Sequence, residues 1–207
     1  MFKLICFDMD GVIFEPENFW MDLHKALGTY EKGVELTKKY RLTDYNKLVE
    51  EVVVKLWKGK DAKAYFDLVN SVKYLKGVKE TFSKLKDFQT AIISSGSIDL
   101  ARRAEKDLGV KYVIANELVI KDRKISGEFV WPIGAGTHKK VEAINNLCKD
   151  LNISPKEIIF IGDSITDIEA FRHVGKSIAF NSDSEELKKA ATHVVEGNDL
   201  RKILKYI

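Results

Sequence analysis

Short apolar runs rich in β-branched and aromatic residues recur along this 207-residue chain, and helical patterns separate most of them. Such an alternation is typical of a doubly wound parallel sheet. The runs are apolar on both faces, which agrees with strands that helices cover on both sides. We therefore expect an α/β fold whose strands include LICF (4–7), TAIIS (90–94), YVIA (112–115), IIFIG (158–162), SIAF (177–180) and HVV (193–195).

The helices between these strands are predicted from apolar residues that recur at intervals of three and four positions. Residues 98–108 show this spacing and stop at Gly109, a residue suited to the end of a helix. Residues 138–151 and 164–174 repeat the pattern. The chain thus offers the crossover helices that a parallel sheet requires.

Two segments interrupt the alternation. Residues 16–75 contain no convincing strand pattern and read as several short helices, and the valine run 52–54 is assigned to a helix from its neighbours. Residues 116–132 contain two alternating runs around KDRK, which predict a β-hairpin. We expect a Rossmann-like core built from residues 1–15 and 76–207, with residues 16–75 inserted as a helical-bundle cap domain.

The charge and the apolar content of the chain limit the classes of binding partner that we expect. The net charge of +3, with lysines scattered along the chain, gives no reason to expect nucleic acid or membrane partners. No apolar run approaches the ~18 residues of a membrane helix, and the start leaves no room for a signal peptide before Asp8. Cys6 and Cys148 lie in apolar runs and are expected to be reduced core thiols. We expect a cytoplasmic protein with a small-molecule partner, and its oligomeric state stays open.

Polar residues follow three of the expected strands. Asp8 and Asp10 follow the first strand, residues 95–97 (SGS) follow the second, and residues 163–167 (DSITD) follow IIFIG. Each group alone can be helix capping or turn chemistry, and the lysine pair 139–140 can be exposed surface. Ligands of doubly wound sheets bind beyond the carboxyl ends of the strands, so the joint occurrence at these ends predicts one functional site.

The chemistry of that set points to phosphoryl transfer. Clustered carboxylates that cannot neutralise one another need a cation, and ligands that are all oxygen favour a hard ion such as Mg²⁺. A carboxylate can also act as a nucleophile toward phosphorus. Hydroxyl and amide groups at a helix N-terminus suit the oxygens of a phosphoryl group, and a lysine offsets the remaining charge.

Taken in order, the motifs DMDGV, IISS, the lysine of THKKVEAI and IGDSITD resemble those of the haloacid dehalogenase superfamily of phosphohydrolases. The resemblance covers essentially the whole chain and implies an Mg²⁺-dependent phosphomonoester hydrolase with an aspartyl-phosphate intermediate. It implies that Asp8 is the nucleophile and a metal ligand, and that Asp10 is the general acid and base, with its backbone carbonyl on the metal. Asp163 would be a further metal ligand, and Asp167 would hold the lysine or a metal-bound water.

The same resemblance assigns the phosphate-binding groups. Ser95 and the amide of Gly96 would hold the phosphate, and Lys140 would orient the nucleophile and neutralise charge. Ser94 is an alternative to Ser95, although SSGSIDLA aligns best with the family when Ser95 takes the role. Lys139 is an alternative to Lys140, which we prefer because KVEAI leads directly into a helix.

The inserted cap and the hairpin resemble those of the phosphoserine phosphatase branch, which suggests phosphoserine or a similar small phosphorylated metabolite as substrate. Glu17 falls where that branch places a carboxylate for the substrate amino group. The chain departs from the branch at residues 11–12, where Gly-Val replaces the usual Ser-Thr. Arg41 is the only arginine in the cap for a substrate carboxylate, and Lys39 or Lys55 would substitute poorly.

Three other functions remain as alternatives. A phosphomutase of the same fold agrees with DMDGV, but the cap and the hairpin favour the phosphatase. A catalytically silent phosphate- or metal-binding protein is a second alternative, although every chemical group is present. A receiver-like signalling domain also uses an acidic cluster, but its motif order and its lack of a large cap argue against it.

The aromatic residues of the insertion have two interpretations. Trp20, Trp57, Phe14 and Phe19 fit the hydrophobic core of the cap better than a platform for the substrate. Phe14 and Phe19 flank Glu17, so they are the more plausible substrate contacts of the four.

Overall fold

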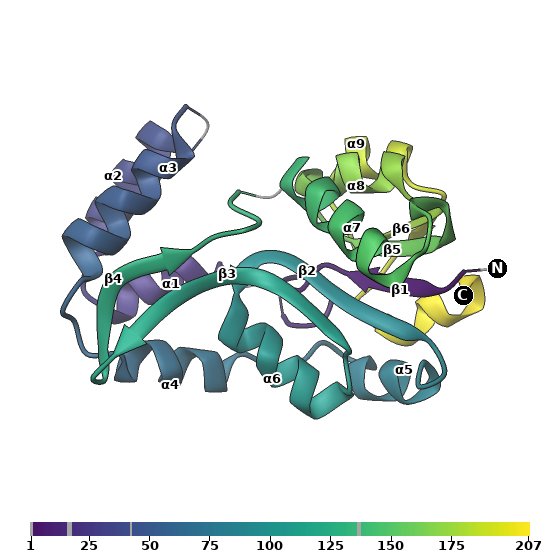
Figure 1. Ribbon diagram of the computed structural model, residues 1–207, viewed down its shortest axis with the longest axis horizontal. Helices are drawn as coiled ribbons and strands as arrows, with labels where there is room; N and C mark the ends of the chain where they lie inside the picture. Colours follow the sequence, from purple (N-terminus) through teal and green to yellow (C-terminus); the bar gives the residue numbers. More distant parts are fainter. Residues whose placement is uncertain (1, 16–17, 42, 136–137) are drawn as a thin grey trace.

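A computed structural model describes residues 2–15, 18–41, 43–135 and 138–207 (Figure 1). Within these residues seven strands form one sheet in the order β4-β3-β2-β1-β5-β6-β7. All neighbouring strands are parallel except β3 and β4, which are antiparallel. The strands are β1 (Leu4–Phe7), β2 (Gln89–Ser97), β3 (Tyr112–Lys121), β4 (Lys124–Val130), β5 (Ile158–Gly162), β6 (Lys176–Phe180) and β7 (His193–Val195).

Helices cover both faces of this sheet, as predicted for a doubly wound fold. Figure 1 shows α7, α8 and α9 on one face and α5 and α6 on the other. The helices are α1 (Phe19–Ala26), α2 (Tyr30–Tyr40), α3 (Tyr45–Val49), η1 (Glu50–Trp57), α4 (Lys63–Ser71), α5 (Val78–Lys84), α6 (Ile98–Leu108), α7 (His138–Leu151), η2 (Pro155–Glu157), η3 (Ile165–Asp167), α8 (Ile168–His173), α9 (Glu185–Ala190) and η4 (Leu200–Tyr206). No helix among the described residues has the length and apolar character needed to span a membrane.

The central strand β1 is buried on both faces, which explains its unbroken apolar sequence. Ile5 and Phe7 pack into the hydrophobic cluster on the α5 and α6 side, and Leu4 and Cys6 pack into the cluster beneath α7 and α8. Cys6 and Cys148 are buried free thiols, as predicted, and burial raises the pKa of Cys6. Two hydrophobic clusters thus fix the position of β1, and this positions the residues that directly follow the strand.

The described part of the insertion, 18–41 and 43–75, is helical, as the sequence indicated. The valine run 52–54 lies in η1, a helix of π type rather than an ordinary α-helix. The hairpin was also predicted, but β3 is longer than expected. It pairs with β2 through Tyr112–Ile114 and continues without interruption into the antiparallel pairing with β4.

The predicted helix ends are partly different in the structure. Helix α6 ends at Gly109, which adopts the left-handed conformation (φ 74°), as expected for such a position. The pattern of 164–174 begins as the 3₁₀ turn η3 and then becomes α8. Gly175 follows this helix, and glycine is needed there for lack of space rather than for a left-handed backbone. A Cβ at this position would lie 2.0 Å from the Lys156 carbonyl oxygen.

The chain enters and leaves the helical insertion through two segments that lie side by side. The Leu75 N–H donates to the Ile13 carbonyl at 2.9 Å, and the Glu15 N–H donates to the Lys73 carbonyl at 2.9 Å. These bonds join the segment after β1 to the segment before α5. The insertion is therefore anchored next to the residues that follow β1.

The β3–β4 hairpin forms a second connection to the insertion. It extends beyond the sheet toward the helices of residues 19–71 (Figure 1). The Ile125 N–H donates to the Lys60 carbonyl at 2.9 Å, and the Ile125 carbonyl accepts from the Gly59 N–H at 2.8 Å. A third bond runs from the Ala62 N–H to the Arg123 carbonyl at 2.8 Å. The hairpin thus supports the helices that stand above the sheet edge.

Candidate active site

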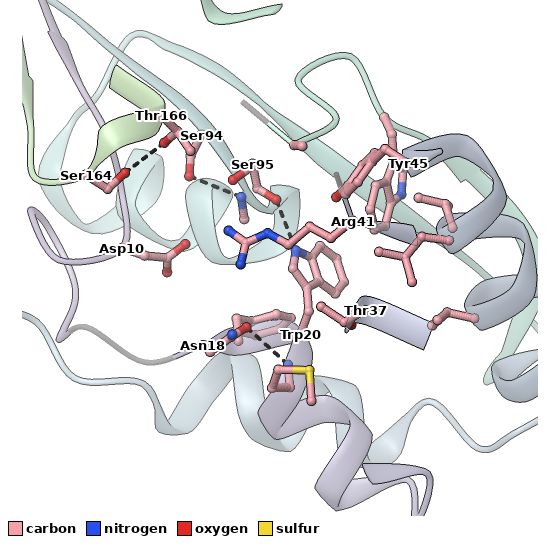
Figure 2. A pocket seen from close by; sticks show the side chains of 18 of the residues that line it. Asp10, Asn18, Trp20, Thr37, Arg41, Tyr45, Ser94, Ser95, Ser164 and Thr166 are labelled. Carbon is pink, nitrogen blue, oxygen red and sulfur yellow. Dashed lines mark hydrogen bonds between the residues drawn. The ribbon is translucent and has the colours of Figure 1, made fainter. Parts of the chain in front are cut away.

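A pocket of about 420 Å³ opens at the carboxyl ends of β1, β2 and β5, beneath the helical insertion (Figure 2). Its floor comes from the sheet, and its walls come mostly from α1, α2, α3 and η1. The residues that line it include Asp8, Asp10, Trp20, Arg41, Tyr45, Leu48, Val52, Trp57, Ser94, Ser95, Gly96, Trp131, Asp163, Ser164 and Thr166. This is the edge at which the sequence predicted a ligand site.

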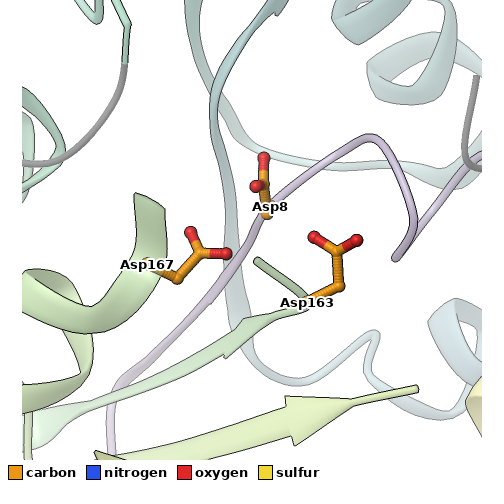
Figure 3. Close-up of side chains that lie close together, drawn as sticks. All are labelled: Asp8, Asp163 and Asp167. Atoms are coloured by element: carbon orange, nitrogen blue, oxygen red, sulfur yellow. The ribbon is translucent and has the colours of Figure 1, made fainter. Parts of the chain in front are cut away.

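Three aspartates meet on the floor of the pocket. Asp8 directly follows β1, and its N–H donates to the Ile161 carbonyl of β5 at 2.8 Å. Asp163 directly follows β5, and Asp167 comes from the turn η3. One carboxylate oxygen from each of the three lies within 4.8 Å of the others (Figure 3). The three aspartates therefore form one cluster, in which Asp167 lies as close as Asp8 and Asp163, the two carboxylates expected to bind the metal.

Lys140 lies among these acids. Its Nζ donates to Asp8 Oδ2 at 2.7 Å and to Asp167 Oδ1 at 2.6 Å, and its side chain is completely buried. Burial lowers the pKa of Lys140, but the two carboxylates raise it more, so the pKa is above its usual value and the lysine is charged. Lys139 instead pairs with Glu142 at 2.7 Å on the exposed side of α7. The structure thus brings Lys140, and not Lys139, to the site.

One lysine does not balance three clustered carboxylates, of which Asp8 and Asp167 are buried and Asp163 is half-buried. Burial, followed by the charges of Asp8 and Asp167, raises the pKa of Asp163 to about 8. Burial also raises the pKa of Asp167 to about 6, although Lys140 opposes the shift. The site therefore lacks positive charge at neutral pH. Its donor atoms are all oxygens, so the residues fit a hard divalent cation such as Mg²⁺.

Two glycines make room for this cluster. Gly11 has φ +77°, and a Cβ at this position would lie 2.0 Å from Asp163 Oδ2. A Cβ at Gly162 would lie 2.5 Å from the Asp167 Cγ. Sequence reasoning recorded Gly11 as a departure from a related branch and missed its spatial role. The available signal was the position of each glycine directly beside an aspartate motif.

The last residues of β2 form the turn at which the sequence predicted phosphate binding. Ser94 is buried, and its Oγ accepts a hydrogen bond from the Gly96 N–H at 3.1 Å (Figure 2). Ser95 is half-buried, and its Oγ makes no hydrogen bond with the described residues. The Ser95 carbonyl accepts from Trp20 Nε1 at 3.0 Å and from Asn116 Nδ2 at 2.9 Å. The hydroxyl of Ser95 is thus available to a ligand, whereas that of Ser94 serves the turn itself.

Asp10 lies beside this turn, and a Cβ at Gly96 would come within 2.6 Å of its Oδ2. Figure 2 shows Arg41 extending from the insertion across the pocket toward Asp10. The sequence had identified Arg41 only as the one arginine of the cap, and its long reach into the pocket depends on the packing of α2 and α3. Glu17 lies outside the residues that the structure describes.

Asn116 is a supporting residue to which sequence reasoning gave no role at the site. It is fully buried, and its Nδ2 donates to the carbonyls of Ser95 and Gly134, each at 2.9 Å. Its Oδ1 accepts from the N–H groups of Ile133 and Gly134 at 3.2 and 3.1 Å. Asn116 thus ties the end of β2 to the loop before α7, which carries Lys140. The signal was the asparagine of the NELVIK stretch, which sequence analysis used only to recognise the hairpin.

The four aromatic residues of the insertion divide between core and pocket. Phe14 is fully buried and stacks on Tyr74, with ring centroids 4.6 Å apart, as expected for a core residue. Phe19, Trp20 and Trp57 line the pocket. Phe14 and Phe19 were the two expected to be nearer the substrate, but Phe14 is absent from the pocket lining, whereas Trp20 and Trp57 line it together with Phe19.

A family model for haloacid dehalogenase-like hydrolases matches residues 2–175. The chain belongs to this family. The match spans all the site residues described above, including both aspartate motifs, the serine turn and Lys140. The family that the four motifs resembled in the sequence is thus shown independently.

Full-length relatives narrow the comparison. The chain is 28% identical to a phosphoserine phosphatase of Methanocaldococcus jannaschii, over 99% of this chain and 97% of the relative. A solved phosphoserine phosphatase with bound substrate superposes with a TM-score of 0.84 at 26% identity, covering 100% of this chain and 99% of the other. A phospho-aspartyl intermediate analogue of phosphoserine phosphatase gives 0.83 at 27% identity, with 100% and 99% covered. This hydrolase is a phosphatase that resembles the phosphoserine phosphatase branch.

Proposed function

We propose that this hydrolase cleaves a small phosphomonoester with the help of Mg²⁺, through an aspartyl-phosphate formed on Asp8. One observation carries the proposal: Asp8 lies at the floor of the pocket, held by the buried Lys140 and adjacent to Asp163. A carboxylate fixed in this way is oriented for attack while a lysine offsets its charge.

In the first step a carboxylate oxygen of Asp8 bonds to phosphorus and the bond to the ester oxygen breaks. The leaving alcohol takes a proton from the carboxyl group of Asp10, which borders the same pocket. In the second step Asp10 accepts a proton from water as the water oxygen attacks phosphorus. The bond between phosphorus and Asp8 then breaks, and inorganic phosphate and the free enzyme result.

Asp8, Asp163 and the backbone carbonyl of Asp10 are the groups proposed to hold Mg²⁺, with Asp167 as a supporting acid that also fixes Lys140. When bound, the ion supplies positive charge that offsets the phosphate dianion and the carboxylates. The Ser95 hydroxyl and the Gly96 amide hold the phosphoryl oxygens at the end of β2.

Residues 16–75 are proposed as a cap domain over a core of residues 1–15 and 76–207. The paired segments at Ile13–Glu15 and Lys73–Leu75 support these boundaries, because they form a narrow connection between the two parts. Phosphoserine is the reference substrate, since the relatives named above are phosphoserine phosphatases. Glu17 is the proposed partner of its amino group, and Arg41 is the cation that lines the pocket.

The test is release of inorganic phosphate from phosphoserine, phosphoglycolate, sugar phosphates and nucleotides, with Mg²⁺ and with chelator. The proposal expects phosphate release that requires the cation. Net transfer of the phosphoryl group between substrate positions without phosphate release would indicate a phosphomutase instead. Absence of turnover on every ester in the presence of Mg²⁺ would contradict the proposed function.

A further inference from the structure

The three tryptophans of this chain line the same pocket, although they belong to distant parts of the sequence. Trp20 lies on α1, Trp57 ends η1, and Trp131 follows β4. The rings of Trp20 and Trp131 stack with centroids 5.0 Å apart and planes at 29°. The rings of Trp20 and Trp57 stack at 6.2 Å and 26°. Together they form an indole column along one wall of the pocket.

The column presents ring surface to a ligand. Trp20 and Trp131 are half-buried, so part of each ring remains accessible. Each indole N–H already has an acceptor within the protein, and polar recognition by these groups is therefore not available. The bonds run from Trp20 to the Ser95 carbonyl (3.0 Å), from Trp57 to the Thr29 hydroxyl (3.2 Å) and from Trp131 to the Glu117 carbonyl (3.2 Å).

The other walls extend this apolar character. Tyr45, Leu48 and Val52 line the pocket from α3 and η1. His24 is also at the wall, but burial lowers its pKa to about 4, so it is neutral at pH 7. Among the described lining residues, Arg41 is the only lysine or arginine. Above the aspartates, the described surface thus consists largely of rings and aliphatic groups, with Asn18, Thr37 and Arg41 as polar side chains among them.

We infer that the preferred substrate carries a flat apolar group, an aryl or heteroaryl ring, one or two carbons from the ester oxygen. The inference rests on the proposed phosphomonoesterase function and concerns only the alcohol part of the ester. Trp20 is bonded to Ser95, which is the proposed phosphate-binding residue, so the indole column begins beside the phosphate. Trp20 stacks on an indole at both Trp57 and Trp131, so a ring attached by a short link would pack against the accessible surface of Trp131 and the accessible edge of Trp20. A volume of about 420 Å³ leaves room for such a group.

The first experiment compares 2-phenylethyl phosphate with ethyl phosphate and with phosphoserine. The first two are esters of primary alcohols, so their leaving groups have similar reactivity and the ring is the main difference. Transfer of roughly 100 Å² of ring surface from water to the pocket corresponds to about 50-fold in affinity. We expect kcat/KM for 2-phenylethyl phosphate to exceed that for ethyl phosphate by about this factor, and also to exceed that for phosphoserine.

A second experiment measures binding without turnover. 2-Phenylethylphosphonate and ethylphosphonate have a carbon–phosphorus bond that a phosphatase does not hydrolyse. Because all three tryptophans line the pocket, their fluorescence reports binding directly. The aryl phosphonate is expected to bind at least tenfold more tightly than the ethyl compound, an order-of-magnitude value from the same ring transfer.

Substitutions of Trp131 test whether the preference for the aryl ester depends on the indole column. Trp131→Ala removes one half-buried indole and is expected to lower the aryl-to-ethyl ratio about tenfold, from the loss of its share of ring contact. Trp131→Phe retains a ring and should restore part of the ratio. Phe66→Ala is the matched control, because Phe66 is a 41% exposed aromatic residue of α4 outside the pocket lining. It should leave the ratio unchanged.

The outcomes separate this inference from the function on which it rests. Turnover of ethyl and 2-phenylethyl phosphate at similar kcat/KM, or a clear preference for phosphoserine, overturns the aryl preference and leaves the phosphatase intact. Tight binding of the aryl phosphonate without hydrolysis of any ester supports the pocket chemistry and refutes the proposed function. Equal affinity for the two phosphonates overturns the inference whatever the activity.

Discussion

The buried Lys140 can be removed without changing the shape of the site much, by the substitution Lys140→Met. Its Nζ contacts Asp8 at 2.7 Å and Asp167 at 2.6 Å, and the lysine and Asp167 side chains are fully buried. Breaking a buried pair by removing one partner costs about 3–5 kcal/mol, since the other charge loses its compensation. Both carboxylates retain a backbone donor, from Met9 at 2.7 Å and from Ser164 at 3.2 Å. We therefore take this range as the total loss for both pairs.

The assay is urea unfolding of metal-free protein at pH 8, followed by far-ultraviolet circular dichroism. With a slope of about 2 kcal/mol per M, a loss of about 3–5 kcal/mol corresponds to a fall of roughly 2 M in the urea midpoint. At pH 6 the loss should shrink by about half, because Asp167, whose pKa burial raises to about 6, can bind a proton instead of remaining charged. Lys139→Met is the matched control, since Lys139 forms only an exposed pair with Glu142 and should cost less than about 0.5 kcal/mol.

Two results would refute this reasoning. One is a Lys140→Met variant that is no less stable than Lys139→Met at pH 8. The other is a loss of equal size at pH 6 and pH 8, which would mean that uncompensated carboxylate charge is not its cause. The two variants should also differ in phosphatase activity. Lys140→Met should be strongly impaired, and Lys139→Met should have nearly the activity of the unsubstituted protein.

Three further predictions concern the same floor of the pocket. Gly11→Ala forces a Cβ to within 2.0 Å of Asp163 Oδ2 at φ +77°, so calorimetry should show Mg²⁺ affinity reduced at least about tenfold; unchanged affinity would contradict the close approach. The folded-state pKa values of Asp163 and Asp167 (about 8 and about 6) exceed the ordinary 3.8, so their stabilising contribution, present below pH 4, is lost as pH rises to 8. The Tm of metal-free protein should therefore fall as the pH rises from 5.5 to 8.5, and it should fall less in Asp163→Asn. Added Mg²⁺ should raise the Tm most at pH 8.5. If the rise in Tm caused by Mg²⁺ did not depend on pH, this would argue against a cation at this cluster. Ser95→Ala should raise KM for a phosphate ester by roughly tenfold through loss of a phosphate contact, whereas Ser94→Ala should mainly cost about 1 kcal/mol of stability; the reverse pattern would assign the phosphate to Ser94.

Much of the core was accessible from sequence because its signals are local. The apolar runs at 4–7 and 158–162 are buried on both faces, and each ends directly at an aspartate. In a parallel sheet such ends lie at one edge, so Asp8 and Asp163 had to be close once the fold was inferred. Lys140, which the sequence reading preferred to Lys139, is the lysine that lies beside Asp8 and Asp167, because only one of two adjacent helical residues can face the sheet.

The pocket walls were harder to predict, since they depend on how separate elements pack. Trp131 belongs to the hairpin by sequence, yet it stacks on Trp20 of α1. The reach of Arg41 into the pocket depends on the placement of α2, and no periodicity encodes that. Gly11 and Gly162 are explained only by the positions of two carboxylates, which lie far apart in the chain.

The central claim is that Asp8 forms a covalent bond to phosphorus. The most direct measurement incubates the enzyme with Mg²⁺ and a ³²P-labelled phosphomonoester that it hydrolyses, quenches in acid, and maps the label by mass spectrometry. We expect a base-labile acyl phosphate on Asp8, absent from Asp8→Asn, together with loss of Mg²⁺-dependent hydrolysis in that variant. Label on another residue, or hydrolysis that survives in Asp8→Asn, would contradict it.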